Sequence, residues 1–250
     1  MSLFAREEAP ACSYWPEPAG WYAMVARNLA TWEIAPLGIR RDALTLFDCG
    51  ANRGLWTRAA LEFWRGVTVS AHLFEPSSRN CAFMRDATHG LLWTPEQRPR
   101  IHINECAVGK EAGELPIFSD WEGSWLASLA ARPGLEPKSA VPVVALDEYA
   151  ANHGVEVIDL LKLDVEGWEY QALQGAKGLI DRGTVQHILF EFGETMVYSR
   201  VFFRDFWEML SGRYEIFHLN GNTHKLAKVE SYSGEWEKFW GTTLYFCRVK

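Results

Sequence analysis

The sequence predicts an α/β fold with a mostly parallel sheet, helices on both faces and an antiparallel last strand. Apolar strand-like runs alternate with helix-like runs over residues 44–210, a pattern typical of parallel sheets. The run at residues 158–163 is apolar almost throughout, as in strands buried on both faces. The last two strand-like runs, at 214–219 and 243–249, have no helix-length amphipathic connector, so we expect an antiparallel end.

Each element has a local reason in the sequence. The first strand, at residues 44–47, leads into an acid and a glycine loop, and a helix at 55–64 begins after Gly54. The strand at 69–74 ends in Glu75, and Ser77 or Ser78 is the expected N-cap of the next helix, because serine oxygens accept bonds from free first-turn amides. The remaining expected elements are strands at 101–105, 158–163, 186–192, 214–219 and 243–249, and helices at 78–88, 166–179 and 203–210.

Two segments fall outside this alternation. Residues 1–41 are expected to form an N-terminal helical cap, with residues 42–250 as a single domain. Strands at 115–118 and 141–145 are expected to pair as a hairpin. Residues 119–137 between them are rich in Gly, Ser, Trp and Pro, which predicts a lid loop.

Composition narrows the class of protein. A hydrophobic fraction of 48% in 250 residues is ample for one core. The net charge of −7 and the lack of a basic run argue against a nucleic-acid partner, and no apolar run approaches the roughly 20 residues of a membrane span. Five scattered cysteines without a Cys-x-x-Cys pair, and a start without signal-peptide features, predict a reducing, cytoplasmic location.

The loop after the first strand indicates a binding site. Asp48 lies at the carboxyl end of that strand, where open α/β sheets place their ligand crevice. Gly50 and Gly54 allow a close approach of backbone to ligand, and their spacing differs from the Gly-x-Gly-x-x-Gly of dinucleotide folds. A carboxylate here would repel a diphosphate and suit a cation, and S-adenosylmethionine, with its ammonium and sulfonium, meets that requirement.

A second acid follows at the tip of the second strand. Glu75 occupies the position at which such folds bind both ribose hydroxyls of an adenosyl group. Taken singly, Asp48 also fits a helix N-cap and Glu75 a solvated turn, whereas two acids around a glycine loop form a more specific set. Glu105, Cys106 and Ala107 follow the third strand, where the adenine usually lies, and are weaker ligand candidates.

A second group of carboxylates follows the central strand. Asp164 ends that strand, and Glu191 ends the neighbouring one and would face the same crevice. Glu166 is expected to open the next helix, where the helix dipole alone favours an acid. Lys162 interrupts the apolar strand, and because buried lysines are costly unless paired, we expect it to pair with one of these acids.

Four motifs fall into one family pattern. They are Asp-Cys-Gly-Ala-Asn-Arg-Gly at 48–54, Phe-Glu-Pro at 74–76, Ala-Val-Gly at 107–109, and Leu-Lys-Leu-Asp-Val-Glu-Gly-Trp-Glu at 161–169 with Gly-Ala at 175–176. With these motifs the chain resembles the FkbM-type methyltransferases over residues 44–192. Cys49 stands where the family often has Val, and the first forty residues, the 121–137 loop and the C-terminal third carry no family motif.

The resemblance implies a Rossmann-like class I methyltransferase with a seven-stranded sheet, S-adenosyl-L-methionine as cofactor, and O-methylation of a hydroxyl on a sugar or secondary metabolite. It implies that Glu75 holds the ribose and that Asp164, Glu166 and Glu191 face the acceptor. The other implied cofactor-binding residues are Asp48, Gly50, Ala51, Asn52, Gly54, Pro76, Cys106 and Ala107.

Methyl transfer from a sulfonium needs mainly alignment and desolvation, together with a base for the acceptor hydroxyl. Asp164 and Glu191 are the two candidates for that base. Carboxylates also suit magnesium, but no ligand spacing demands a metal. We expect a small-molecule or glycan acceptor; the choice between oxygen and nitrogen, and the number of subunits, stay open.

Two other functions fit parts of the pattern. One is a nonenzymatic domain of the same fold that binds an adenosyl ligand without turnover. The other is a nicotinamide-dependent oxidoreductase, which the glycine spacing disfavours and which lacks a Tyr-x-x-x-Lys pair at Tyr149 or Tyr170.

Overall fold

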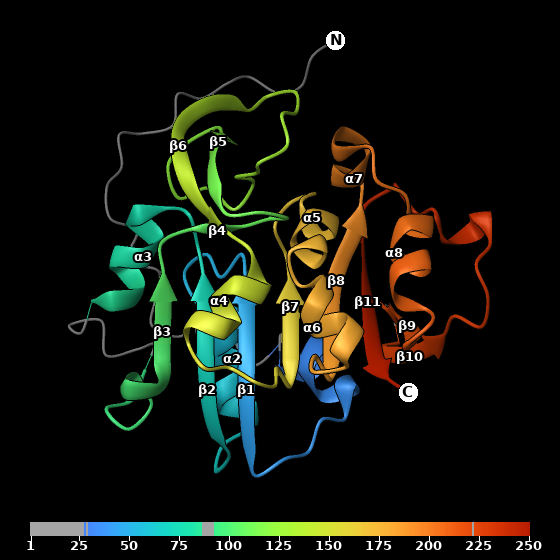
Figure 1. Ribbon diagram of the computed structural model, residues 1–250, viewed down its shortest axis with the longest axis horizontal. Helices are drawn as coiled ribbons and strands as arrows, with labels where there is room; N and C mark the ends of the chain where they lie inside the picture. The colour runs from blue at the N-terminus through green and yellow to red at the C-terminus, as the bar shows by residue number, and fades with distance from the viewer. Residues whose placement is uncertain (1–27, 29, 87–92, 222) are drawn as a thin grey trace.

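Eight strands form the main sheet, in the spatial order β10-β9-β11-β8-β7-β1-β2-β3 (Figure 1). The structure is a computed structural model that describes residue 28 and residues 30–86, 93–221 and 223–250. Strands β1, β2, β3, β7 and β8 run parallel, whereas β11 is antiparallel to both β8 and β9. The strand bounds are β1 (Ala43–Cys49), β2 (Thr68–Phe74), β3 (Ile101–Asn104), β7 (Leu160–Leu163), β8 (His187–Gly193), β9 (Tyr214–Asn220), β10 (Lys225–Lys228) and β11 (Thr242–Val249).

This architecture confirms the predicted Rossmann-like class I methyltransferase fold and its antiparallel last strand. The sheet has one strand more than the seven expected. The additional strand, β10, pairs antiparallel with β9 at the edge of the sheet. It is short and mostly exposed, so its sequence carries no apolar run that would reveal it.

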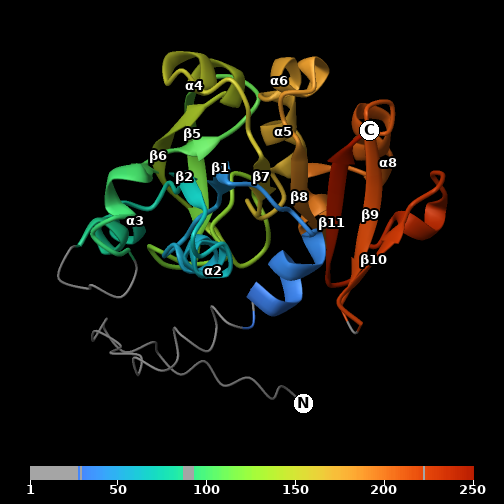
Figure 2. The same cartoon turned by 90° about the horizontal axis from the view of Figure 1, so that it is seen from below.

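Helices cover both faces of the sheet, as seen from below in Figure 2. One face carries α4, α5, α6 and α8, and the other carries α2, α3 and the η1–η2 segment. Helix α3 begins at its predicted cap, since the Ser77 hydroxyl accepts a bond from the Asn80 amide at 3.3 Å. The bounds are η1 (Ala30–Ile34), η2 (Ala35–Leu37), α2 (Leu55–Phe63), α3 (Ser78–Arg85), η3 (Arg98–Arg100), α4 (Leu146–Asn152), α5 (Glu169–Gln174), α6 (Lys177–Arg182), α7 (Thr195–Ser199), α8 (Phe203–Leu210) and η4 (Gly234–Trp236).

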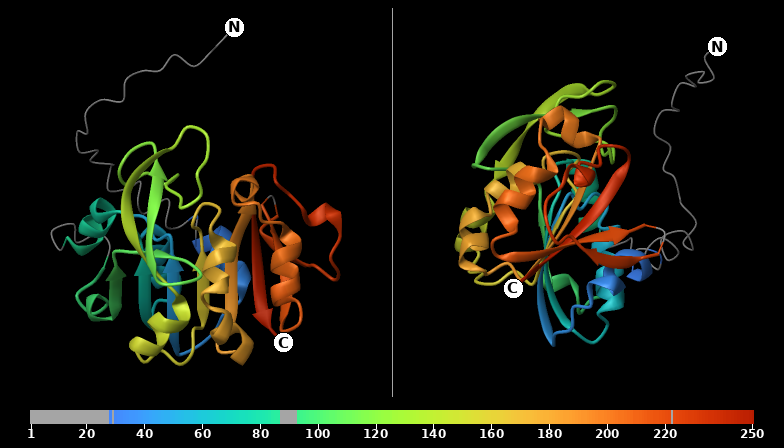
Figure 3. Two further views of the ribbon diagram at one scale, coloured as in Figure 1. Left: turned by 45° about the horizontal axis from the view of Figure 1, so that its top comes forward. Right: turned by 90° about the vertical axis from the view of Figure 1, so that its right-hand side faces the viewer.

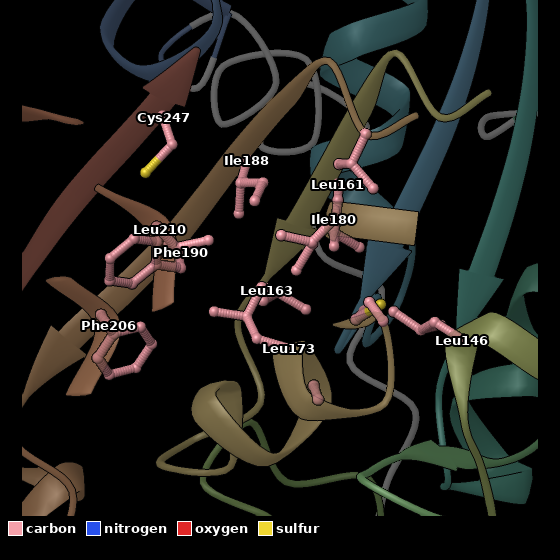
Figure 4. Close-up of a cluster of buried hydrophobic side chains, with 14 of the residues drawn as sticks. Leu146, Leu161, Leu163, Leu173, Ile180, Ile188, Phe190, Phe206, Leu210 and Cys247 are labelled. Atoms are coloured by element: carbon pink, nitrogen blue, oxygen red, sulfur yellow. The ribbon is translucent and has the colours of Figure 1, made fainter. Parts of the chain in front are cut away.

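The larger hydrophobic core lies between the central strands and the α4–α8 face. Figure 4 shows Leu161 and Leu163 of β7 facing Leu173 of α5 and Ile180 of α6. All four side chains are buried, and burial of each such side chain stabilises the fold by roughly 1.5–3 kcal/mol. This packing fixes β7 and therefore the position of the residues that follow it.

A second, three-stranded sheet projects above the carboxyl ends of the parallel strands (Figure 3, left). It consists of β4 (Ala107–Val108), β5 (Gly113–Ser119) and β6 (Glu136–Val144). Strands β5 and β6 are antiparallel, which confirms the predicted hairpin. The connection between them, residues 120–135, lies over the edge of the main sheet at which the parallel strands end.

The helix expected at residues 166–179 is wrong in two respects. It begins only at Glu169, because Glu166 and Gly167 have φ angles of +56° and +98° and so lie outside helical geometry. It is also interrupted after Gln174: Gly175 packs so closely that a Cβ there would lie 2.0 Å from the Gly109 carbonyl oxygen. Glu166 therefore does not gain from a helix dipole.

The segment before β1 packs on the face that carries α2. Trp32 stacks on His224 with ring centroids 5.4 Å apart, and Glu33 accepts a hydrogen bond from the Trp56 indole at 2.8 Å. Most of the predicted N-terminal cap, residues 1–27 and 29, lies outside the described residues. Within the described part of the chain, no helix has the length and apolarity that a membrane crossing requires.

A buried histidine network predicts loss of stability in acid. His72 of β2 is 5% exposed, its Nδ1 lies 2.9 Å from the Tyr149 hydroxyl, and that hydroxyl donates to Asn104 Oδ1 at 3.1 Å. Burial, and then the neighbouring His102 and His153, lower the pKa of His72 to about 4. The folded state thus binds fewer protons than the unfolded state between pH 4 and about 6.5, so stability falls as the pH falls through this range.

We expect this site to remove about 2 kcal/mol of unfolding free energy between about pH 7 and pH 5. His72→Gln keeps a polar partner for Tyr149 but removes the titration, so urea unfolding should show a shallower pH dependence by that amount. His224→Gln, on the turn between β9 and β10 and outside this network, provides the control and should retain the wild-type slope. Equal slopes for wild type and His72→Gln would contradict the assignment.

Candidate active site

A pocket of about 370 Å³ lies at the edge of the main sheet where the parallel strands end. Its floor is formed by the loops that follow β1, β2 and β7 and by Glu191 of β8. The connection between β5 and β6 supplies the opposite wall with Ser124, Trp125 and Ser128, among others. The pocket therefore lies at the crevice where open α/β sheets bind their ligands.

The glycine loop after β1 lies close to the segment that follows β7. Gly50 has a φ of +79°, and a Cβ there would lie 1.7 Å from the Asp164 carbonyl oxygen. The amides of Gly50 and Ala51 donate to the Phe74 carbonyl at 2.9 and 3.1 Å, which ties the loop to the end of β2. Only glycine satisfies both the positive φ and the close approach.

Glu75 connects the same loop to the start of α3. One carboxylate oxygen accepts from the Asn52 amide at 2.8 Å, and the other accepts from the Ser77 amide at 3.0 Å and the Asn80 side chain at 3.2 Å. Burial raises its pKa, and these three donors oppose that rise. Glu75 is 5% exposed and lines the pocket, so its orientation is fixed before any ligand arrives.

Lys162 joins the ends of the two central strands. Its ammonium lies 3.2 Å from Asp48 Oδ1 on β1 and 3.1 Å from Asp164 Oδ2 beyond β7. Asp48 is fully buried, and its second oxygen accepts a bond from the Thr57 hydroxyl at 2.6 Å. Burial lowers the pKa of Lys162, but the carboxylates of Asp164 and Asp48 more than offset this, and the net pKa lies above its ordinary value. The predicted pairing of Lys162 is confirmed, with two acids rather than one.

Glu169 shapes the loop that carries Asp164 and Glu166. Its side chain accepts from the Val165 amide at 2.8 Å and from the Gly167 amide at 2.9 Å. The residue is 1% exposed, and burial raises the pKa of its carboxyl to about 8. These two bonds hold Glu166 in its left-handed conformation, a conformation that non-glycine residues adopt only when their surroundings impose it.

Glu166 also connects the main sheet to the β5–β6 connection. Its carboxylate lies 3.0 Å from the Arg132 guanidinium, with both side chains largely shielded from solvent. Its carbonyl oxygen accepts a bond from the Ser128 hydroxyl at 2.7 Å. Burial raises the pKa of Glu166, and Arg132 opposes that rise.

Glu191 differs from the other acids of the pocket. Within the described residues its carboxyl takes part in no hydrogen bond or ion pair, although it lines the pocket. Burial and then the neighbouring Asp164 raise its pKa to about 9, against the opposing effect of Lys162. Its surroundings therefore favour the protonated form of this carboxyl over the charged one.

The structure brings eight of the twelve predicted site residues to the pocket lining: Gly50, Asn52, Glu75, Pro76, Ala107, Asp164, Glu166 and Glu191. Four others lie outside the lining: Asp48, Ala51, Gly54 and Cys106. Asp48 is separated from the pocket because both of its oxygens face inward, to Lys162 and Thr57. The ligand-binding and catalytic roles of all twelve residues stay predictions.

Several residues of the site have no signal in the sequence spacing. Arg132 pairs with an acid 34 positions later, and Glu33, near the Lys162 cluster, precedes the first strand. Trp168 lines the pocket, and its buried indole nitrogen has no hydrogen-bond partner among the described residues. The described residues contain no group of three or more His, Cys, Asp or Glu side chains arranged to hold a metal ion.

Comparisons with known proteins agree on one family. The family profile described as the methyltransferase FkbM domain matches residues 48–217. The 31-O-demethyl-FK506 methyltransferase FkbM of Streptomyces tacrolimicus is 28% identical over 166 residues, which cover 55% of this chain and 61% of that protein. This chain therefore spans less than two thirds of that relative.

A solved structure shares the fold. The crystal structure of the methyltransferase FkbM from Methylobacillus flagellatus superposes with a TM-score of 0.54 at 17% sequence identity. The superposition covers 91% of this chain and 50% of that one. At this identity the likeness concerns the fold alone.

The contact at Gly50 can be tested against a second glycine with similar backbone geometry. Gly38 has a φ of +66° but open space around its Cβ position, so Gly38→Ala should cost only about 1 kcal/mol of unfolding free energy from the left-handed conformation. Gly50→Ala adds the collision with the Asp164 backbone and should cost roughly 4 kcal/mol or more. Urea denaturation measures both, and similar losses would show that the close approach is absent.

Removal of the Lys162 ammonium should be strongly destabilising. Lys162→Met leaves the buried Asp48 and its neighbour Asp164 without their shared cation, at a cost of about 3–5 kcal/mol. The exposed Lys110 serves as the control, because Lys110→Met should change stability by no more than about 0.5 kcal/mol. Addition of Asp48→Asn to Lys162→Met should restore part of the loss, and a double variant less stable than the single one would refute the pairing.

Proposed function

This chain belongs to the FkbM methyltransferase family, and on that premise we propose that it transfers a methyl group from S-adenosylmethionine to a hydroxyl oxygen of a small-molecule or glycan acceptor. The observation that carries the proposal is that one pocket is lined by Glu75 at the end of β2, by Gly50 of the glycine loop, and by the carboxyl groups of Asp164, Glu166 and Glu191. The name of the Streptomyces relative specifies an O-demethyl substrate, which supports oxygen as the methylated atom.

The residues of the pocket fit the methyl donor. The Glu75 carboxylate is already oriented by three donors. These leave about one of its roughly four lone-pair sites, on Oε2, for a ribose hydroxyl, and a bond to the second hydroxyl would replace one of the three present bonds. Gly50 and Asn52 line the part of the pocket proposed for the methionine, and their amides already donate to Phe74 and Glu75. Ala107, which also lines the pocket, and its chain neighbour Cys106 are the proposed contacts of the adenine.

The charge of the pocket favours a cation over a diphosphate. Glu75, Asp164 and Glu166 line it, whereas the two nearby cations, Lys162 and Arg132, are each already engaged by carboxylates. A further positive charge would therefore be stabilised here, and two phosphate groups would be repelled. This balance supports a sulfonium donor rather than a nicotinamide dinucleotide.

The donor supplies an electrophilic methyl group, so the chain has to align the acceptor, exclude water and accept a proton. Trp125 and Ser128 of the β5–β6 connection line the pocket and are the proposed cover of the acceptor. Asp164 and Glu191, which line the same pocket, are the two proposed acceptors of the hydroxyl proton.

A ligand-binding assay tests the proposal. S-adenosylhomocysteine at 100 times its dissociation constant should add about 2.7 kcal/mol to the unfolding free energy and raise the melting temperature, whereas NAD should not. Glu75→Ala should abolish most of the effect, and Glu62→Ala, which removes an exposed acid of α2 outside the pocket lining, should retain it.

A shift with NAD alone would refute the methyltransferase proposal, and full binding by Glu75→Ala would refute the ribose assignment. Radiolabelled donor, incubated with a panel of hydroxylated acceptors, then reports turnover. Binding of S-adenosylhomocysteine without methyl transfer to any acceptor would instead favour a nonenzymatic domain.

A further inference from the structure

We propose that Glu191 is a proton switch set by the charge of the methyl donor: it is protonated in the pocket without a cation, and it releases its proton when a positively charged donor enters. The proposal deepens the proposed function, on which it rests, and it selects Glu191 over Asp164 as the base. It is carried by the arrangement of charged groups around these two side chains.

Asp164 already forms an ion pair with Lys162. Its Oδ2 accepts a hydrogen bond from the Lys162 ammonium at 3.1 Å, and that ammonium also faces Asp48 at 3.2 Å. A carboxylate oxygen that accepts a bond from an ammonium has that lone pair occupied. Asp164 is thus less free than Glu191 to accept a bond from the acceptor hydroxyl.

Glu191 has no such partner within the described residues. The charged groups that face it are the carboxylates of Asp164, Glu169 and Glu166, with Lys162 as the one cation. On its other side β11 presents Leu244 opposite it and Thr242 at the pocket wall, neither of which carries a charge. Lys162 is divided between two other acids and offsets only part of the effects of burial and Asp164, so the pKa of Glu191 rises to about 9.

A cation in the same pocket reverses this balance. A positive charge near two adjacent carboxyl groups favours ionisation of the one that is still protonated. The proton leaves to solvent, and Glu191 becomes a carboxylate that can act as a general base. The base therefore forms only once the donor is in place.

Over one reaction cycle Glu191 releases one proton and takes up one proton. In the transfer step a bond forms between the acceptor oxygen and the methyl carbon, and the carbon–sulfur bond breaks with its electron pair left on sulfur. Glu191 accepts the hydroxyl proton and returns to its protonated form. That form suits the pocket once the sulfonium has become a neutral thioether, so the charge of the ligand and the state of Glu191 change together.

Proton release can be measured without an acceptor. Calorimetric titration in phosphate and in Tris, at about pH 7.4, gives the protons exchanged on binding from the difference in buffer ionisation heat. S-adenosylmethionine and S-adenosylhomocysteine are compared on the wild type and on Glu191→Gln. The Gln side chain copies the shape of the protonated carboxyl, and subtraction of this variant cancels protons exchanged by the amine of the ligand.

We expect the wild type to release close to one proton more than Glu191→Gln with S-adenosylmethionine, and about none more with S-adenosylhomocysteine. Glu208→Gln, an exposed acid on α8, should behave as the wild type. Equal proton counts for the two ligands in the wild type would overturn the switch. A count that persists in Glu191→Gln would assign the proton to another group and equally overturn it.

A second measurement covers the case in which Glu191→Gln does not fold. Asp164→Asn removes the nearest repelling charge and frees Lys162 for Glu191, so Glu191 should already be ionised, and the extra release with S-adenosylmethionine should disappear. Undiminished release in that variant would overturn the proposal. Failure of the wild type to bind either ligand would refute the methyltransferase function itself, which separates the two failures.

Discussion

The ammonium of Lys162 organises the edge of the sheet at which the pocket lies. It sits between Asp48 and Asp164, which end adjacent strands in the middle of the sheet. Without a cation between them these two carboxylates would repel each other, and the fully buried Asp48 would pay a large desolvation penalty. The pairing fixes the distance between the loops that follow β1 and β7. The Trp56 ring lies 5.6 Å from the same ammonium and is itself held by Glu33, so the segment before β1 supports the arrangement.

The geometry of the pocket depends on this position of the two loops. Gly50 can pass against the Asp164 backbone only because it has no side chain, and Glu75 then holds the rest of the glycine loop through Asn52. On the other side, Glu169 holds the loop that follows Asp164. Carboxylates thus both line the pocket and hold its loops in place. Those of Glu75 and Glu169 accept hydrogen bonds from backbone amides, whereas Glu191 has no partner among the described residues. The division of roles among chemically similar side chains is set by which donors each one meets.

The sequence was informative where chemistry is local. Alternating strands and helices, the glycine loop and the acids at strand ends depend on neighbours within a few residues, and these features predicted the fold class and eight of the residues that line the pocket. Contacts between distant segments were not predictable in this way. Nothing in the spacing shows that Asp48 faces inward to Lys162, 114 positions later, or that Arg132 reaches Glu166. The expected helix at 166–179 failed for a different reason. The Glu169 side chain accepts hydrogen bonds from the amides of Val165 and Gly167, and these local bonds impose a left-handed turn on a sequence with ordinary helical character.

The ion pair between Arg132 and Glu166 links two parts of the molecule that could otherwise vary independently. The β5–β6 excursion is the obvious unit to exchange when substrate range is engineered, since it contributes a whole wall of the pocket. If a grafted excursion lacks an arginine at the position of Arg132, the Glu166 carboxylate loses its ion-pair partner while it stays shielded from solvent. Recombination between homologues should therefore treat the excursion and the Asp-Val-Glu-Gly turn as one inherited block, with crossover points chosen outside both.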